Sequence, residues 1–306
     1  MTLFSIIAAL VLEQIRPLAQ ERVLLQPLRR YALFLEERFN DGQERHGAVA
    51  WAVAVLLPTL ALLLLQGLLL ATEPEWALLL NVGALYLTMG FRQFSHFFTD
   101  IHMALRMGEL ERARRLLAAW CGSGVAADQQ SSSEVARLAI EEALVASHRH
   151  VFAPLFWFIA AGPAGALLYR LALFFRLAWG RPEYGGFGRR AERAFAWIDW
   201  LPQRLSAAAF AIVGDFEDAV YCWRTQAGRW PDTGSGIILA SGAGALGVRL
   251  GAPIRDTAGV RERPELGLGD DADADFMRSA IGLVWRTLVL CLLILALFLV
   301  ASWVGR

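Results

Sequence analysis

The sequence predicts an all-α, polytopic helical membrane protein with amphipathic-helix regions on the cytoplasmic side and a membrane hairpin broken at a Gly-Pro step. Two observations carry this class. Hydrophobic residues fill 56% of the 306 positions and the mean hydropathy is +0.43, which is more apolar than ordinary soluble domains. Uncharged runs of helical length alternate with arginine-rich stretches, as in chains that cross a bilayer several times.

The N-terminal region, residues 1–47, is expected to be an interfacial or tightly packed helix followed by a cytoplasmic segment. Its opening MTLFSIIAALVLEQI has roughly a dozen apolar residues before Glu13, fewer than the ~20 that a spanning helix needs. Residues 13–47 then carry six Arg, which places them in the cytoplasm by the positive-inside bias.

Two transmembrane helices are predicted within residues 48–91. Residues 48–71 hold no charge over 24 positions, and Pro58 is expected to bend this helix. The acidic turn TEPE follows, and residues 76–91 form a shorter span that ends before Arg92.

The cytoplasmic region 92–150 is expected to hold two amphipathic helices, with Ser133 and Glu134 at the start of the second. Residues 151–179 are apolar but interrupted at Gly162-Pro163, so each half is too short to cross alone. They form either one kinked span or a hairpin that enters the membrane and returns. The arginines that follow favour the hairpin.

Residues 180–283 are predicted to be a second cytoplasmic region of short helices and loops, and 284–306 the last transmembrane helix, anchored by Trp285 and Trp303. The expected location is the bacterial inner membrane, crossed several times.

Composition excludes several classes of chemistry. The formal net charge is zero, so no basic surface predicts nucleic-acid binding. All 29 basic residues are Arg, which excludes a Schiff base or a P-loop lysine and leaves phosphate recognition to guanidinium or backbone N–H groups. The three cysteines lie far apart and predict neither a disulfide framework nor a zinc site.

Two groups of ionisable residues flank apolar segments. His148 and His150 precede residues 151–179; their i, i+2 spacing is poor for chelation on a helix, so a collar at headgroup level is favoured over a metal pair. Arg92, His96 and Asp100 share one helical face. They form either a ligand or proton-relay site or an ordinary intrahelical pair at the surface.

A glycine-rich stretch and an acidic run are further candidates. Gly244 and Gly247, with Arg249, predict either close helix packing, which is favoured, or a phosphate cradle at a helix start. Asp270 and Asp275 belong to GDDADAD (269–275), which is either a solvated loop or an oxygen-ligand cation site.

The order of several motifs resembles two related bacterial groups. MTLFSIIAALVLEQ, APLFWFIAAG (153–162) and D-W-L-P-x-R-L (199–205) resemble AmpE, an inner-membrane protein associated with β-lactamase induction. Ala153-Pro154-Leu155-Phe156, Tyr169-Arg170, the Leu-Pro-Gln-Arg-Leu that contains Arg204, GALGVRLG (244–251) and Gly269-Asp270 resemble CobD/CbiB, the cobalamin-pathway synthase. The resemblance covers nearly the whole chain and implies a synthase that joins an aminopropanol-type phosphate to adenosylcobyric acid with ATP and Mg²⁺.

Several polar positions of the synthase pattern are replaced. Glu141 matches its first acid, but Val145, Ala146 and Arg149 follow, the run LFFRL occupies 173–177, and Leu239 stands where the synthase has a glutamate. Leu and Phe neither clamp phosphates nor stabilise charge at an acyl centre. The departures therefore predict a family member with degenerate synthase motifs and an AmpE-like regulatory or ligand-binding role, with the synthase activity as the alternative.

The resemblance and the motifs together define the expected site. The candidate ligand-binding residues are Arg92, His96, Asp100, Glu141, His148, His150, Tyr169, Arg170, Arg204, Gly244, Gly247 and Arg249, and the candidate metal ligands are Asp270 and Asp275. No cofactor is expected unless the chain is the enzyme. The expected partners are the lipid bilayer and a small molecule or an envelope-signalling protein, with a homodimer left open.

Overall fold

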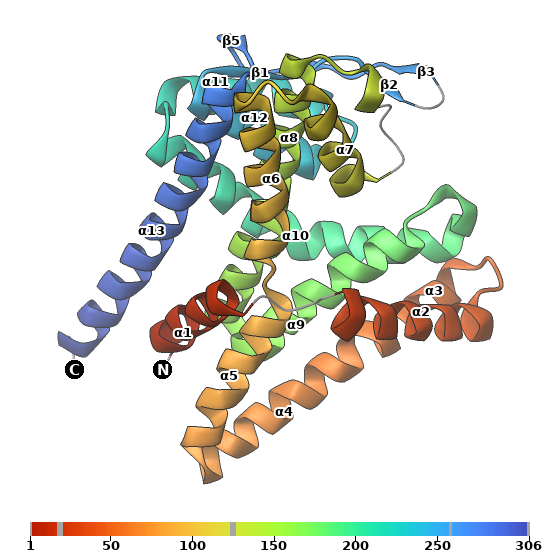
Figure 1. The fold of residues 1–306 in the computed structure, drawn as a ribbon. Coiled ribbons are helices and arrows are strands. Elements are labelled where there is room, and N and C mark those ends of the chain that lie inside the picture. Colours follow the sequence, from red (N-terminus) through yellow and green to blue (C-terminus); the bar gives the residue numbers. More distant parts are fainter. Residues whose placement is uncertain (1, 17–20, 123–126, 257–258, 305–306) are drawn as a thin grey trace. The chain divides into compact units, whose positions relative to one another are not determined.

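A computed structural model describes residues 2–16, 21–122, 127–256 and 259–304 (Figure 1). The chain divides into two compact units. Unit 1 comprises Met1–Gly90 and Arg149–Pro202, and unit 2 comprises Phe91–His148 and Gln203–Arg306.

The regular elements among the described residues of unit 1 are all helices. Its N-terminal elements are α1 (Thr2–Ile15), η1 (Glu21–Leu25), α2 (Gln26–Phe39), α3 (Glu44–Trp51), η2 (Ala52–Leu56), α4 (Leu57–Thr72) and α5 (Pro74–Thr88). Unit 1 also contains α9 (Ala153–Trp179), η5 (Pro182–Tyr184) and the first part of α10 (Gly185–Val213). The short η4 (His148–Phe152) precedes α9.

Large aromatic side chains form the core of unit 1. Phe175 and Trp179 of α9 lie one turn apart, with ring centroids 4.5 Å from each other, and Trp179 meets Phe187 of α10 at 5.1 Å. Phe187 and Phe195 lie two turns apart on α10, so one face of this helix is buried against α9. Leu35 of α2 is also a buried member of this cluster.

Helix α9 breaks where the sequence predicts. Ala161 and Gly162 leave helical geometry, and Gly162 has φ +65°, a conformation that glycine adopts without strain. A side chain at Gly165 would overlap the carbonyl of Trp157, so the two halves of α9 meet closely beside the break. The break is the kink that both alternatives for 151–179 share.

Unit 2 combines helices with a small set of strands. Its helices are α6 (Phe91–Arg106), α7 (Leu110–Cys121), η3 (Ala127–Gln129), α8 (Ser132–Ser147), the end of α10, α11 (Phe216–Gln226), η6 (Ala227–Arg229), α12 (Thr233–Leu246) and α13 (Ala274–Val304). The prediction of two helices in 92–150 is wrong, because Gly108 ends the first amphipathic stretch early and α6, α7 and α8 form instead. Helix α8 starts at Ser132, one residue before the predicted Ser133, and Ser131 caps it in a capping box with Glu134.

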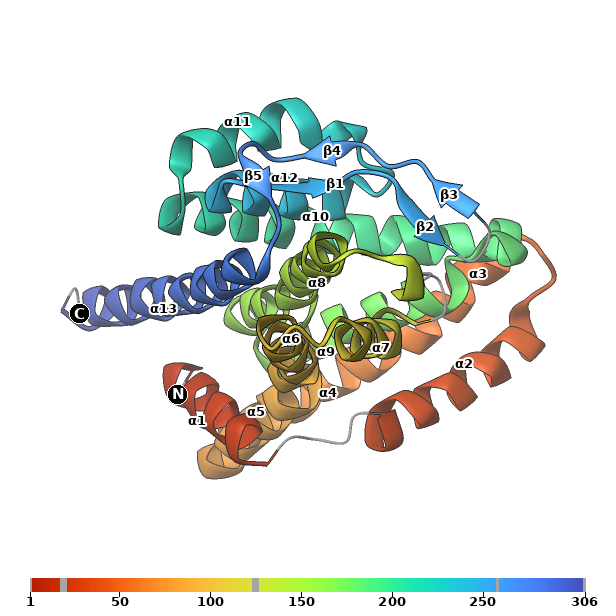
Figure 2. The same cartoon turned by 45° about the horizontal axis from the view of Figure 1, so that its top comes forward.

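The mainly helical structure fits the all-α prediction, and a few short strands add to it in unit 2. They are β1 (Val248–Gly251), β2 (Ile254–Asp256), β3 (Gly259–Arg261), β4 (Glu265–Leu266) and β5 (Asp270–Asp271). Strand β1 lies between β4, to which it is antiparallel, and β5, to which it is parallel; β2 and β3 pair separately. Figure 2 shows β1 and β4 beside α12.

Three helical stretches of the described residues are long and apolar enough to cross a membrane: Glu44–Thr72, Ser132–Trp179 and Ala274–Val304. The first contains the span predicted at 48–71, and the last covers the predicted 284–306 as far as Val304, where the described residues end. The shorter predicted span at 76–91 falls on α5, whose 15 residues are fewer than the ~17–25 of a spanning helix. The span at 76–91 therefore stays a prediction.

Candidate functional site

The N-terminal half of α8 carries one side of a polar pocket in unit 2. The Ser131–Glu134 capping box fixes the first turn of this helix, and Ser133 and Arg137 follow at an i, i+4 step that places both on one face. The Arg137 side chain is 14% exposed. Its Nη2 donates to the carbonyl of Pro253 at 3.3 Å, while its buried Nε has no hydrogen-bond partner.

Strand β1 carries the opposite side. Gly247 ends α12 in the left-handed conformation, and the chain turns directly into β1. Val248 and Leu250 are buried, so Arg249 between them points outward, as alternation along a strand requires. Its Nη2 lies 2.9 Å from Oδ1 of Asp271 on the neighbouring strand β5.

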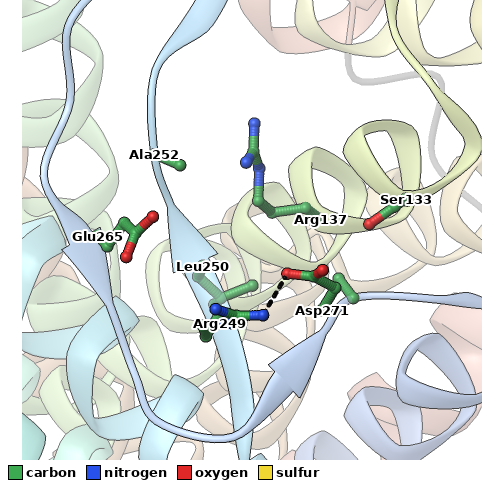
Figure 3. A pocket seen from close by; sticks show the side chains of 8 residues that line it. Ser133, Arg137, Arg249, Leu250, Ala252, Glu265 and Asp271 are labelled. Atoms are coloured by element: carbon green, nitrogen blue, oxygen red, sulfur yellow. Dashed lines mark ion pairs between the residues drawn. The ribbon is translucent and has the colours of Figure 1, made fainter.

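These groups surround a hollow of about 300 Å³, counted with its open mouth. Figure 3 shows the Arg249–Asp271 ion pair next to Arg137, with Glu265 on the other side of β1. The lining residues are Ser133, Arg137, Arg249, Leu250, Ala252, Glu265, Asp271 and Ala272. Two guanidinium groups thus face two carboxylates. A ligand with both an anionic and a cationic group is the best electrostatic match.

A buried clamp holds this strand region to α8. Glu141 Oε2 accepts from Nη1 of Arg263 at 2.8 Å, and Glu141 Oε1 accepts from the N–H of Gly251 at 2.8 Å. Arg263 also donates to the carbonyls of Gly251 and Ala252 and lies over the ring of Trp230. Glu141, a predicted ligand contact, is therefore engaged inside the protein, where it positions β1.

A second polar cluster is buried in unit 1. The hydroxyl of Tyr169 donates to Asp199 Oδ1 at 3.0 Å, and Arg170 Nη1 lies 2.5 Å from Nδ1 of His150. Because a guanidinium group only donates, Nδ1 of His150 is the acceptor in this contact. Glu13 also interacts electrostatically with Arg170. Ionisable groups inside an apolar helical region are rare unless they have a function.

The histidine collar at headgroup level is corrected. His148 is 2% exposed, and its Nδ1 lies 2.9 Å from the hydroxyl of Ser206 within unit 2. His150 contacts Arg170 within unit 1. Both rings therefore have protein partners, and the buried His148 is not part of a collar against lipid.

The predicted Arg92–His96–Asp100 group does not form a His–Asp pair. Nδ1 of the exposed His96 lies 2.9 Å from the backbone carbonyl of Arg92, while Asp100 is exposed one turn further along α6. The intrahelical alternative describes this contact best. Arg204 lies partly exposed on α10.

For the glycine motif the structure favours close helix packing over a phosphate cradle, and for the acidic run it favours an exposed segment over a cation site. Gly244 packs so closely on α11 that a Cβ would lie 2.4 Å from the carbonyl oxygen of Asp218, and Gly247 caps the end of α12. A helix end presents carbonyls, so the expected phosphate cradle at a helix start does not form here. Asp270 is exposed on β5 and Asp275 pairs with Arg106 at 2.8 Å. No group of three metal-ligand side chains occurs in the described ranges.

Sequence reasoning missed most of the pocket. Arg137, Glu265 and the clamp residue Arg263 carry no motif, because the strands of this region are too short to show alternation. Asp271 lies within the acidic run GDDADAD, where only Asp270 and Asp275 were singled out. Asp199 was quoted only as part of D-W-L-P. The signal that could have found them is the unusual number of charges around GALGVRLG.

The class of the chain follows from its long apolar helices: it is a helical membrane protein. It also carries buried ionisable groups and a charged pocket. Comparison with known proteins narrows the class. A family model described as "CobD/Cbib protein" matches residues 6–284, and the chain belongs to this CobD/CbiB family.

Curated relatives cover the chain at similar length. One from Stutzerimonas stutzeri is 36% identical over 95% of this chain and 96% of its own length. One from Chromobacterium violaceum is 36% identical over 78% of this chain and 75% of its own, and one from Mycobacterium tuberculosis is 31% identical over 78% of each. Each is named cobalamin biosynthesis protein CobD. No solved structure matches the chain.

Proposed function

We propose that this chain is a multi-pass inner-membrane protein that acts in cobalamin biosynthesis. The observation that carries the proposal is the similarity to the Stutzerimonas stutzeri relative named cobalamin biosynthesis protein CobD, which spans 95% of this chain and 96% of the relative. A similarity of this extent covers both units. The proposed activity is the synthase reaction that the family resemblance implies: amide formation between an aminopropanol-type phosphate and adenosylcobyric acid.

The charges of the pocket in unit 2 support this substrate. An aminopropanol phosphate carries a phosphate and an amine. Arg137 and Arg249 offer the guanidinium groups that bind phosphate in a chain without lysine. Glu265 and Asp271 offer carboxylates for the ammonium group, and one of them can accept the proton that the amine loses before it attacks an acyl carbon.

The pocket also offers an oxygen ligand for the Mg²⁺ that the synthase activity implies. Mg²⁺ keeps several waters and is held through one or two carboxylates together with substrate phosphates, so it needs no preformed cluster of protein ligands. Asp271, exposed on β5 and lining the pocket, is the carboxylate that would hold Mg²⁺ there with the phosphates of ATP, which leaves Glu265 for the ammonium group. When bound, ATP would activate the acceptor carboxyl group.

One observation favours the second candidate, an AmpE-like binding role without catalysis. Ala146, Leu173 and Leu239 occupy positions where the resemblance calls for polar groups, and each is at most 3% exposed. These side chains pack in the interior and contribute no charge. Under this alternative the pocket binds its ligand but forms no amide bond.

Growth of a bacterial strain that lacks its own CobD separates the two candidates. Expression of this chain should restore growth on medium that requires cobalamin synthesis, and Arg137→Met should abolish the rescue. Arg106→Met, which removes an exposed arginine from an ion pair outside the pocket, is the matched control and should rescue normally. No rescue by a protein that is present in the membrane and still binds the aminopropanol phosphate would support the AmpE-like role instead.

A further inference from the structure

An exposed row of aromatic and apolar side chains lies on α10 in unit 1. Trp197 is 83% exposed, Trp200 53% and Leu201 44%, although tryptophan is usually one of the more buried side chains. They occur at three- and four-residue steps and therefore share one face of the helix. The core face of α10, with Phe187 and Phe195, is a different one.

Two arginines on the same face of α10 form ion pairs with the first residue of a membrane-spanning stretch. Arg190 and Arg193 precede Trp197 by seven and four residues and lie on its side of the helix. Nε of Arg190 is 3.0 Å from Oε1 of Glu44, and Nη1 of Arg193 is 2.5 Å from the same oxygen. Glu44 is the first residue of the apolar stretch Glu44–Thr72.

A close backbone contact fixes this arrangement. A Cβ at Gly47 would lie 2.3 Å from the carbonyl oxygen of Phe187, so α3 and the beginning of α10 touch without an intervening side chain. The end of the span and the start of α10 therefore lie at the same level of unit 1. Helix α4, the continuation of this span, has no buried residue along its length.

We propose that the Trp197 face of α10 lies in the headgroup region of the lipid bilayer and anchors unit 1 to the membrane surface. Tryptophan rings concentrate at this level, because their apolar body enters the acyl boundary while the indole N–H stays hydrated. Glu44, the first residue of the span, marks the depth of this headgroup region. The occupant of this face is the lipid surface, and the inference rests on the proposed membrane location.

Site-specific fluorescence quenching in lipid nanodiscs tests the inference on the full chain. With the native cysteines replaced by alanine, an environment-sensitive fluorophore is attached at Trp197→Cys, Glu192→Cys or Leu64→Cys. Glu192 is exposed on another side of the same helix, and Leu64 of α4 is 74% exposed within the span. Quenchers are doxyl lipids labelled near the headgroup or deep in the acyl chain, and iodide in the aqueous phase.

The label at Trp197→Cys should be quenched by the shallow doxyl lipid and protected severalfold from iodide relative to Glu192→Cys. Equal iodide quenching at the two positions would overturn the inference, and protection from both iodide and lipid would point to a protein partner and also overturn it. Leu64→Cys should respond to the deep doxyl lipid. If it does not, the proposed membrane location fails; if it does and Trp197→Cys does not, the anchor alone fails.

Discussion

Arg263→Met should be among the most destabilising single substitutions in unit 2. The change removes two hydrogen bonds to the Glu141 carboxylate, at 2.8 and 3.3 Å, and two to backbone carbonyls of the β1 end, at 3.2 and 3.1 Å. The two side chains are each only 8% exposed, so water cannot replace the lost partner. Glu141 would remain buried, with the more distant Nε of Arg137, 3.9 Å from its Oε1, as its remaining charged partner.

Removing one partner of a buried ion pair costs about 3–5 kcal/mol in the free energy of unfolding. Glu141→Gln should cost less, about 1.5–3 kcal/mol, the range for a hydrogen bond to a charged group, because an amide oxygen can still accept from Gly251 N–H. Combining Glu141→Gln with Arg263→Met should cost less than the sum of the two changes, because both single changes disrupt the same Glu141–Arg263 interaction.

Denaturant titrations of the detergent-solubilised protein, followed by circular dichroism, measure these free energies. Arg106→Met is the control, because the Arg106–Asp275 pair is 52% and 78% exposed and should contribute no more than about 1 kcal/mol. An Arg263→Met protein as stable as the Arg106→Met protein would refute the clamp.

Three further predictions concern packing, protonation and the buried cluster. Gly244→Ala should destabilise by about 1–3 kcal/mol, as overpacking does, because its Cβ would overlap the Asp218 carbonyl; thermal unfolding measures this. Burial, followed by the nearby Asp218, raises the pKa of the Cys222 thiol to about 11 from 9.0, so the thiol should alkylate slowly at pH 8 until the protein unfolds. The unfolded chain loses this proton first, so the Cys222 contribution to stability is complete below pH 9 and is lost as pH rises towards 11, which unfolding titrations across that range would show. Tyr169→Phe should cost about 1–3 kcal/mol by removing the hydrogen bond to Asp199, seen as a lower unfolding midpoint.

Matched changes distinguish these effects from general fragility. Gly83→Ala, at a helical glycine with open space around it, should leave stability unchanged or slightly raised. Rapid alkylation of Cys222 in the folded protein would contradict its burial. A Tyr169→Phe protein with an unchanged midpoint would show that the hydroxyl contributes nothing.

The sequence predicted the features that depend on local pattern. The uncharged run of residues 48–71 lies inside the stretch Glu44–Thr72, and the Gly162-Pro163 break coincides with the non-helical Ala161 and Gly162. Both follow from physical rules that act within one segment: apolar length in the first case and glycine geometry in the second. The family was also identified from motif order, and the family model confirms it.

The pocket and its clamp could not be predicted in this way. Glu141 and Arg263 are 122 residues apart, and no rule of local spacing brings them together. The strands β1 to β5 have two to four residues each, which is too short for alternation to appear. The histidines were misinterpreted for the same reason, because the partners of His148 and His150 are Ser206 and Arg170, far along the chain.

Catalysis by the purified protein tests the central claim most directly. The protein in nanodiscs would be incubated with adenosylcobyric acid, an aminopropanol phosphate and ATP–Mg²⁺, and the amide product followed by mass spectrometry. The proposed function predicts product with the wild type and with Arg106→Met, and its loss with Arg137→Met. Absence of product from a wild-type protein that is folded and binds the aminopropanol phosphate would contradict the synthase activity.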